Sequence, residues 1–384
     1  MRQLFNLLFA GILVTGAIVF SRAGSDQVTQ SKAETWKKIK HLFKPPAEFK
    51  DQYGTYPSPL KFYDGRPVKN KKEWPRRRKE ILDTWNAMMG QWPPLIKGQR
   101  LTILDSTRRE NFTQYRVSFK WTPDEITDGY LLVPDGEGKK PAVITVYYEP
   151  ETAIGEGKLP LRDFAYQLAK RGFVTLSIGT TKGTNDKTWS MYYPDIQNAT
   201  IEPLSMLAYT AANAWETLAL QPQVDSSRIG IMGHSYGGKW ALFAASLYDK
   251  FACSVWSDPG IVFDNKDDMA NYWEPWYLGY HPQPWRTRGL ITEDNPAKGL
   301  YPTLMEKGFD LTDLHALMAP RPFMVSGGSV DGPDCWIALN HAIAVNRLLG
   351  YKNRVAMANR PDHSPNEESN EYIYSFLDYF LKYK

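Results

Sequence analysis

Hydrophobic residues along most of the chain follow two different periods. Within 115–121 apolar and polar residues alternate, whereas 142–148 is continuously apolar, as in a strand covered on both faces. Longer segments between such strands repeat apolar residues every three or four positions, which indicates helices. The alternation predicts an α/β fold with a doubly wound, mainly parallel sheet, helices on both faces and antiparallel first strands. The predicted strands are 115–121, 129–133, 142–148, 173–178, 228–232, 251–257, 322–327 and 353–358, and the predicted helices include 161–171, 202–220, 310–318, 335–349 and 367–383.

An apolar run near the N-terminus has a different meaning. Residues 4–20 are apolar except for Asn6, and a small-x-small sequence that ends at Ala23 follows them. This order is typical of a signal peptide, so we predict that residues 1–23 are one; an uncleaved membrane anchor is the alternative. Cleavage implies a secreted or periplasmic protein with no stable membrane insertion.

The rest of the chain divides into two parts. Residues 24–112 are expected to form an N-terminal arm and a helix, near 75–90, that packs on the core. That helix has one apolar face, and its basic run 76–79 is interpreted as a solvated face. Residues 113–384 are expected to form the α/β domain, with an aromatic-rich insertion at 259–310.

Composition excludes several classes of protein. The net charge is +4, and removal of 1–23 lowers Lys plus Arg from 46 to 44 against 42 acidic residues, which leaves +2; this is no nucleic-acid footprint. Cys253 and Cys335 belong to distant strand ends, so we expect two free thiols rather than a disulfide. No zinc-type Cys/His spacing and no glycine-rich phosphate loop occurs, so we expect no metal and no cofactor.

The sequence Gly233-His234-Ser235-Tyr236-Gly237 is the most informative feature for chemistry. It follows the predicted strand 228–232 and precedes a helix-forming stretch. In such a G-x-S-x-G turn the serine lies at a sharp strand-to-helix reversal, where its hydroxyl is exposed above the sheet. We therefore predict that Ser235 is a nucleophile. A glycine-rich turn with an incidental serine is the alternative.

A serine nucleophile needs a histidine base. Of the six histidines, His363 alone lies on a loop between the last predicted strand and the last helix. Such loops, at the carboxyl ends of strands, carry the sites of open α/β sheets. We therefore predict that His363 is the base, and that His234, inside the G-x-S-x-G turn, faces away from the serine.

The base in turn needs a carboxylate that orients it. Asp331 follows the strand 322–327 and gives the chain order serine, aspartate, histidine; Asp258 follows the strand 251–257. We prefer Asp331, with Asp334 a weaker neighbour, and keep Asp258 as the alternative. The aspartate that is not the acid is expected to cap a loop.

An oxyanion also needs two donors. The backbone N–H of Tyr236, directly after the nucleophile, is expected to be the first. The second is expected in the loop after 142–148, at about Tyr148 or Glu149. Loss of one such donor typically costs about 3 to 4 kcal/mol of transition-state stabilisation.

These features resemble the α/β-hydrolase superfamily. The resemblance is carried by 224–230 leading into Gly233–Lys239, by Ala319-Pro320-Arg321-Pro322, and by the late Asp362-His363. Within the superfamily the chain is most similar to secreted carbohydrate esterases of the acetylxylan and glucuronoyl esterase kind, relatives of dienelactone hydrolases.

The resemblance also has implications for single residues. It implies that Lys239 contacts sugar hydroxyls. It also keeps Asp258 as a candidate acid, because the acid of these esterases also stands at that place. Tyr236 departs from the arginine that glucuronoyl esterases carry after the nucleophile, which puts a strict glucuronate-ester specificity in doubt.

The insertion 259–310 supports a sugar substrate independently. Its aromatic side chains follow a strand's carboxyl end, and aromatic faces stack on the C–H faces of sugar rings. We expect one or two of these aromatics, with Trp273 and Trp276 the candidates, in the binding cleft, and ordinary packing for the others. The aromatic residues are Phe263, Tyr272, Trp273, Trp276, Tyr277, Tyr280 and Trp285.

Together these features predict a serine esterase that hydrolyses acyl (acetyl) or uronate esters on polysaccharide through a Ser-His-Asp acyl-enzyme. A serine peptidase of the prolyl oligopeptidase type is one alternative. The segment before the first strands lacks the repeats of a propeller, which disfavours it. A non-catalytic binding protein with a hydrolase fold is the other alternative.

Overall fold

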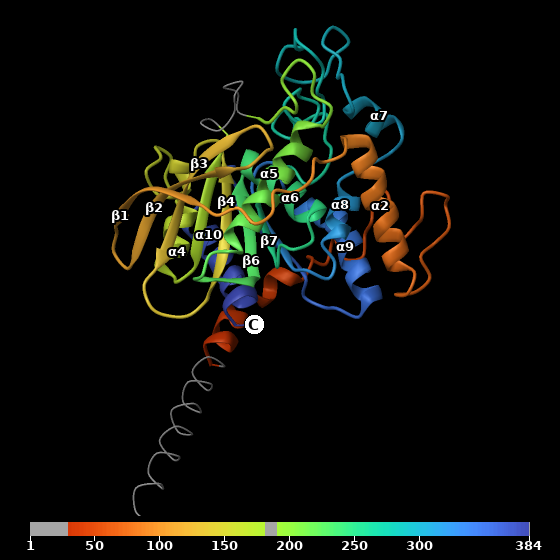
Figure 1. Cartoon of the computed structure of the whole chain (residues 1–384). Coiled ribbons are helices and arrows are strands. Elements are labelled where there is room, and N and C mark those ends of the chain that lie inside the picture. The colour runs from red at the N-terminus through yellow and green to blue at the C-terminus, as the bar shows by residue number, and fades with distance from the viewer. Residues whose placement is uncertain (1–29, 181–189, 384) are drawn as a thin grey trace, which may run out of the picture.

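A nine-stranded sheet forms the centre of the molecule in a computed structural model that describes residues 30–180 and 190–383 (Figure 1). The strand order is β1-β2-β3-β5-β4-β6-β7-β8-β9. The predicted α/β fold is therefore confirmed. The strands are β1 (Thr102–Arg108), β2 (Phe112–Lys120), β3 (Ile126–Pro134), β4 (Lys140–Tyr147), β5 (Val174–Gly179), β6 (Val224–His234), β7 (Ser254–Ser257), β8 (Phe323–Gly327) and β9 (Val355–Asn359).

The sheet has an antiparallel part and a parallel part. The pairs β1–β2, β2–β3 and β3–β5 are antiparallel, and all pairs from β5–β4 to β8–β9 are parallel. This agrees with the expected antiparallel first strands. Strand β1 was not predicted, because every one of its residues is exposed and its sequence therefore carries no alternation.

Helices cover both faces of the sheet, as predicted. On one face, α5, α6, α8 and α9 pack together, with α2 against α8; on the other face lie α4, α10 and the short helices η1 and η3. In Figure 1, α2, α8 and α9 lie together on the side opposite β1. The helices are 30–39, η1 (Lys40–Phe43), α2 (Trp74–Met89), α3 (Pro150–Ala153), α4 (Phe164–Lys170), α5 (Pro203–Leu218), α6 (Tyr236–Leu247), α7 (Tyr301–Glu306), α8 (Thr312–Leu317), η2 (Pro333–Cys335), α9 (Trp336–Leu349), α10 (Glu367–Leu377) and η3 (Asp378–Lys382).

Helix α2 confirms the predicted 75–90 helix but corrects its basic face. Arg77 is buried, and its guanidinium donates to Asp313 at 3.3 Å and to the carbonyl of Pro59 at 3.1 Å. Asp313 also accepts from the hydroxyl of Tyr63 at 2.6 Å. A buried cation needs such partners, so Arg77 fixes the arm and α2 to α8 instead of facing solvent.

Two further expectations concern the thiols and the N-terminus. Cys253 and Cys335 do not form a disulfide and are both buried, as predicted. The predicted signal peptide lies outside the described residues. None of the helices in 30–180 and 190–383 is long and apolar enough to cross a bilayer.

Candidate active site

The turn between β6 and α6 holds Ser235 in a strained conformation. Its φ is +56°, in the left-handed region that non-glycine residues rarely adopt. A Cβ on Gly233 would lie 2.2 Å from the carbonyl of Gly237, and a Cβ on Gly237 would lie 2.0 Å from the carbonyl oxygen of Val146. The backbone N–H of Ser235 donates to Ser257 O at 2.7 Å. The two glycines are therefore required for the predicted G-x-S-x-G turn to form.

The loop after β9 brings His363 to this serine. Nε2 of His363 lies 2.9 Å from Oγ of Ser235, and the ring is only partly buried. The backbone of the loop is held by Arg360, which donates to the carbonyl of His363 at 2.6 Å and to that of Ser326, on β8, at 2.7 Å. The predicted pairing of serine and histidine is thus present, although their sequence positions are 128 apart.

The aspartate that pairs with His363 is not Asp331, which the sequence analysis preferred. Oδ2 of Asp258 lies 2.7 Å from Nδ1 of His363, and the Asp258 side chain is fully buried. Asp331 instead accepts hydrogen bonds from the backbone N–H groups of Gly260 and Ile261, at 3.0 and 2.6 Å. Asp258, the alternative that the sequence left open, is therefore the aspartate that pairs with the histidine.

Strand register explains this outcome. His234, Ser257 and Ser326 occupy equivalent positions on β6, β7 and β8, so these strands end at the same level. Asp258 comes directly after Ser257 and has φ +51°, which turns the chain at once. Asp331 comes four residues after the end of β8, where the loop has already bent back. Chain order alone does not distinguish these two geometries.

His234 is buried beside Ser257 and His363. Its Nδ1 is 3.1 Å from Oγ of Ser257, and its ring centroid is 4.7 Å from that of His363. Burial lowers its pKa well below the ordinary value, and the nearby His363 adds to this effect. His234 therefore packs beside the neighbouring imidazole as a neutral ring, and its Nδ1 is directed to Ser257 and not to Ser235.

A cavity of about 370 Å³ opens beside Ser235. On one side the ring of Tyr148 stacks on that of Tyr236, with centroids 4.2 Å apart and planes 9° from parallel. This places the loop after β4 next to the first turn of α6, as the predicted oxyanion donors require. The lining residues are Tyr148, Glu149, Ser235, Tyr236, Lys239, Asp268, Met269, Asn271, Trp276, Tyr277 and Arg288.

The two predicted tryptophans have different positions. Trp276 lines the cavity and is 8% exposed. Trp273 is fully buried, does not line the cavity, and donates from Nε1 to the carbonyl of Gly289 at 2.9 Å. Trp273 therefore packs inside the insertion, and of the two only Trp276 is placed to contact a ligand.

Lys239 is a buried cation on α6. Its ammonium donates to the carbonyls of Pro259 and Met269, the latter at 3.1 Å, and lies 4.7 Å from the ring centroid of Tyr272. Burial lowers its pKa to about 8. Through these contacts Lys239 ties the insertion to α6 at the cavity wall.

Several residues around the site gave no signal in the sequence. Asn271 and Arg288 come from irregular parts of the insertion and line the cavity. Arg162 donates to the hydroxyl of Tyr147 at 2.8 Å and to Oγ of Ser364 at 3.4 Å, and so connects the loops after β4 and β9. Only the aromatic composition of the insertion pointed to this region.

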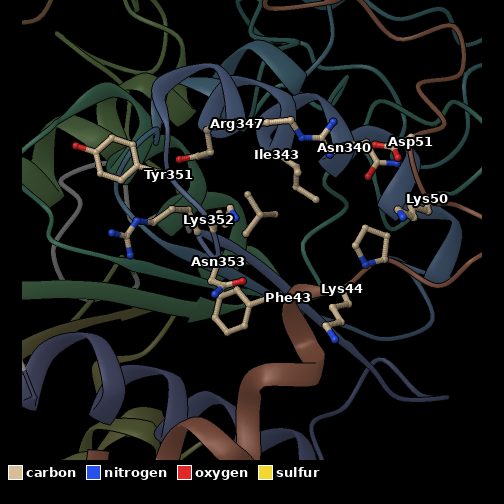
Figure 2. A pocket seen from close by; sticks show the side chains of 14 residues that line it. Phe43, Lys44, Lys50, Asp51, Asn340, Ile343, Arg347, Tyr351, Lys352 and Asn353 are labelled. Carbon is tan, nitrogen blue, oxygen red and sulfur yellow. Dashed lines mark hydrogen bonds and ion pairs between the residues drawn. The ribbon is translucent and has the colours of Figure 1, made fainter. Parts of the chain in front are cut away.

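A larger cavity, of about 550 Å³, is drawn in Figure 2 and shares no lining residue with the cavity beside Ser235. It is bounded by the segment 43–51, by α9 and by the amino end of β9. Five of its fourteen lining residues are basic, and the one acidic residue, Asp51, pairs with Arg347 at 3.1 Å. It is therefore at the end of the sheet opposite to Ser235. Across the described residues no group of three His, Cys, Asp or Glu side chains could hold a metal ion.

Comparison with known proteins agrees with the observed fold. Residues 210–302 match the sequence model of the prolyl oligopeptidase family. No curated protein matches the sequence. A glucuronoyl esterase from Solibacter usitatus is similar in structure, with a TM-score of 0.66 and 18% identity over 88% of this chain and 98% of that one.

Two more solved structures are similar. One is a promiscuous CE15 esterase from a marine bacterial metagenome, with a TM-score of 0.63 and 18% identity over 85% of this chain and 97% of that one. The other is a glucuronoyl esterase from Sporotrichum thermophile in complex with methyl 4-O-methyl-β-D-glucopyranuronate, with a TM-score of 0.54 and 16% identity over 86% of this chain and 88% of that one. At these identities the likeness concerns the fold, and the chain has the α/β-hydrolase fold that its sequence predicted.

Proposed function

We propose that this protein is a serine esterase that hydrolyses carboxylic esters of carbohydrates, acyl (acetyl) or uronate esters, through an acyl-enzyme. The observation that carries the proposal is the continuous hydrogen-bonded series from Ser235 Oγ to His363, 2.9 Å, and from His363 to Asp258, 2.7 Å. A nucleophile, a base and an orienting carboxylate in this geometry are the requirements of acyl transfer.

In the proposed reaction, His363 takes the proton of Ser235 as its Oγ attacks the ester carbonyl. Asp258, paired with Nδ1, stabilises the imidazolium that forms. The backbone N–H of Tyr236 and a donor of the loop at Tyr148 hold the oxyanion of the tetrahedral intermediate. His363 then gives its proton to the leaving alcohol. In the second half of the reaction His363 takes a proton from water, whose oxygen attacks the acyl carbonyl, and returns that proton to Ser235 Oγ as the bond to the acyl group breaks and the acid leaves.

A carbohydrate ester is favoured by the cavity and by the structural neighbours. Trp276 and Tyr277 offer aromatic surface within the cavity that contains the nucleophile. The solved structures most relevant here are glucuronoyl esterases, and one of them holds a methyl glucuronate ester. We propose that a sugar ring lies against Trp276 while its ester carbonyl reaches Ser235.

A serine peptidase is the second candidate, because 210–302 matches the prolyl oligopeptidase family. Residues 30–101 contain helices, turns and one isolated bridge between Lys61 and Pro67, and no strand from which propeller blades are built. The matched segment contains Ser235 and Asp258 but not His363. It therefore does not discriminate between esters and peptides.

Labelling and a substrate panel test the proposal together. We expect a fluorophosphonate to label Ser235 and the enzyme to release acid from acetylated xylan or from methyl glucuronate, with little turnover of proline-containing peptides. Labelling combined with peptide turnover and no ester turnover would favour the peptidase. Absence of labelling would favour a binding protein and contradict both enzymes.

A further inference from the structure

The loops after β7 and β8 each carry an aspartate that binds the other loop. Asp258 Oδ1 accepts the N–H groups of Gly328 at 2.6 Å and of Asp331 at 2.8 Å, and its Oδ2 accepts that of Val330 at 3.4 Å. In the opposite direction, Asp331 accepts the N–H groups of Gly260 and Ile261. The two carboxylates therefore form a reciprocal clasp between adjacent strand ends.

The turn that Asp331 holds is a strained one. Asp258 has φ +51° and Gly260 has φ +80°, so two residues of three have left-handed backbone. For a non-glycine residue such a conformation is strained and persists only where the surrounding structure enforces it. The N–H groups of Gly260 and Ile261, two and three residues after Asp258, donate to Asp331. These hydrogen bonds are placed to hold the turn in its strained conformation.

Asp331 itself is fully buried and does not touch the reacting atoms. Beyond the two N–H groups, the thiol of Cys335 lies 3.9 Å from Oδ1, and the backbone carbonyl accepts from the amide of Asn359, on β9, at 2.9 Å. Burial, followed by the charge of Asp258, raises the pKa of Asp331 above its usual range. The proposed mechanism uses none of its atoms, which leaves this buried acid without a role.

We propose that Asp331 is a positioning residue that, through the N–H groups of Gly260 and Ile261, fixes the strained turn at Asp258 so that Oδ2 meets Nδ1 of His363. This inference rests on the proposed function. In this proposal Asp331 fixes the position of the acid, Asp258, and is not itself the acid. A displacement of about 1 Å in such a site costs on the order of 10²-fold in rate.

The test uses the full-length protein with the substitutions D331N and D331A. Asparagine has the same shape, but its amide nitrogen must face one of the two N–H donors, so one hydrogen bond is lost; alanine loses both. We expect kcat for p-nitrophenyl acetate to fall about 10²-fold in D331N and further in D331A, with little change in KM. We also expect the acid limb of the kcat/KM profile to move to lower pH, because a displaced carboxylate stabilises the imidazolium less.

Asp310 supplies a matched control. It is a buried aspartate that accepts two backbone N–H groups, from Leu311 at 2.6 Å and from Phe263 at 3.4 Å, without contact to the clasp. D310N should alter thermal stability while leaving kcat and the acid limb unchanged. If D331N behaves like D310N, Asp331 is merely structural and the proposal fails. If D331N costs as much as D258N, Asp331 is itself the acid and the proposal fails as well.

A second measurement does not depend on the folding of any variant. In the wild-type protein the amide hydrogens of Gly260 and Ile261 should exchange slowly, because Asp331 holds both; rapid exchange would overturn the clasp. Fluorophosphonate labelling of Ser235 separates this outcome from failure of the proposed function. A wild-type protein that does not label contradicts the esterase, whereas a labelled protein with unaltered D331N kinetics contradicts only the positioning role.

Discussion

The two ends of the parallel sheet differ in what their cavities contain. At the carboxyl ends of β6, β7 and β9 a cavity of about 370 Å³ is lined by Ser235, which is hydrogen-bonded through His363 to Asp258. Ser235 and Asp258 both have left-handed backbone. At the amino end of β9 a larger cavity, of about 550 Å³, is lined by basic side chains around one ion pair (Figure 2). The volume of a cavity therefore does not identify the proposed active site. Strained residues whose polar atoms converge identify it.

Removal of the nucleophile should give the largest difference between the ends. S235A is expected to leave the fold intact and to lower hydrolysis of p-nitrophenyl acetate by about 10⁵-fold or more, because the covalent step is lost. The matched control is S226A, an exposed serine near the amino end of the same strand. Retained turnover in S235A would remove the basis of the proposed mechanism.

The next largest effect is expected for the acid. D258N keeps the shape of the side chain but no longer stabilises the imidazolium, so kcat should fall about 10³- to 10⁴-fold. D264N, at an exposed aspartate in the insertion 259–310, should remain within about two-fold of wild type. Steady-state kinetics with circular dichroism as a check of folding measure both. Near-normal kcat in D258N would return Asp331 to the position of acid.

Loss of aromatic surface in the cavity should affect binding more than chemistry. W276A is expected to raise KM for a carbohydrate ester about five- to ten-fold with kcat nearly constant, since an aromatic contact contributes about 1 kcal/mol. W273F removes the hydrogen bond to Gly289 outside the cavity, so it should lower the melting temperature and leave KM alone. Equal effects of the two on KM would contradict the assignment of Trp276 to the binding surface.

The buried carboxyl group of Asp310 should make the stability of the protein depend on pH. Burial raises the pKa of Asp310 to about 7, so the folded protein favours its neutral form. The stabilisation is complete below the unfolded value, about 3.9, and is lost as pH rises through about 7, by up to about 4 kcal/mol. Thermal unfolding between pH 4 and pH 8.5 should show a smaller decline in D310N than in wild type. Parallel declines would show that Asp310 does not titrate in this range.

The smallest effect is expected at the amino end of the sheet. Y351A and K352A change the lining of the larger cavity, where no catalytic group lies. Turnover and KM should remain within about two-fold of wild type. A ten-fold change in either constant would mean that this cavity takes part in the reaction and that the difference between the two ends is not the one described.

Much of this arrangement could be predicted because it depends on local sequence. Close backbone contacts in the G-x-S-x-G turn require Gly233 and Gly237. Continuously apolar strands such as β4 indicate a sheet covered on both faces. Arg77 shows where the local pattern fails. Its neighbours suggest a solvated face, but the partner that makes its burial stable, Asp313, is 236 residues away.

The sequence by itself determined the α/β-hydrolase fold, the strained serine and the histidine on the last loop, since each follows from a short pattern and from its place in the chain order. Only the tertiary structure decided between Asp258 and Asp331, and between Trp276 and Trp273. The physical reason is that strand register and the direction of a turn set where a carboxylate or a ring points, and both depend on contacts between residues far apart in the sequence.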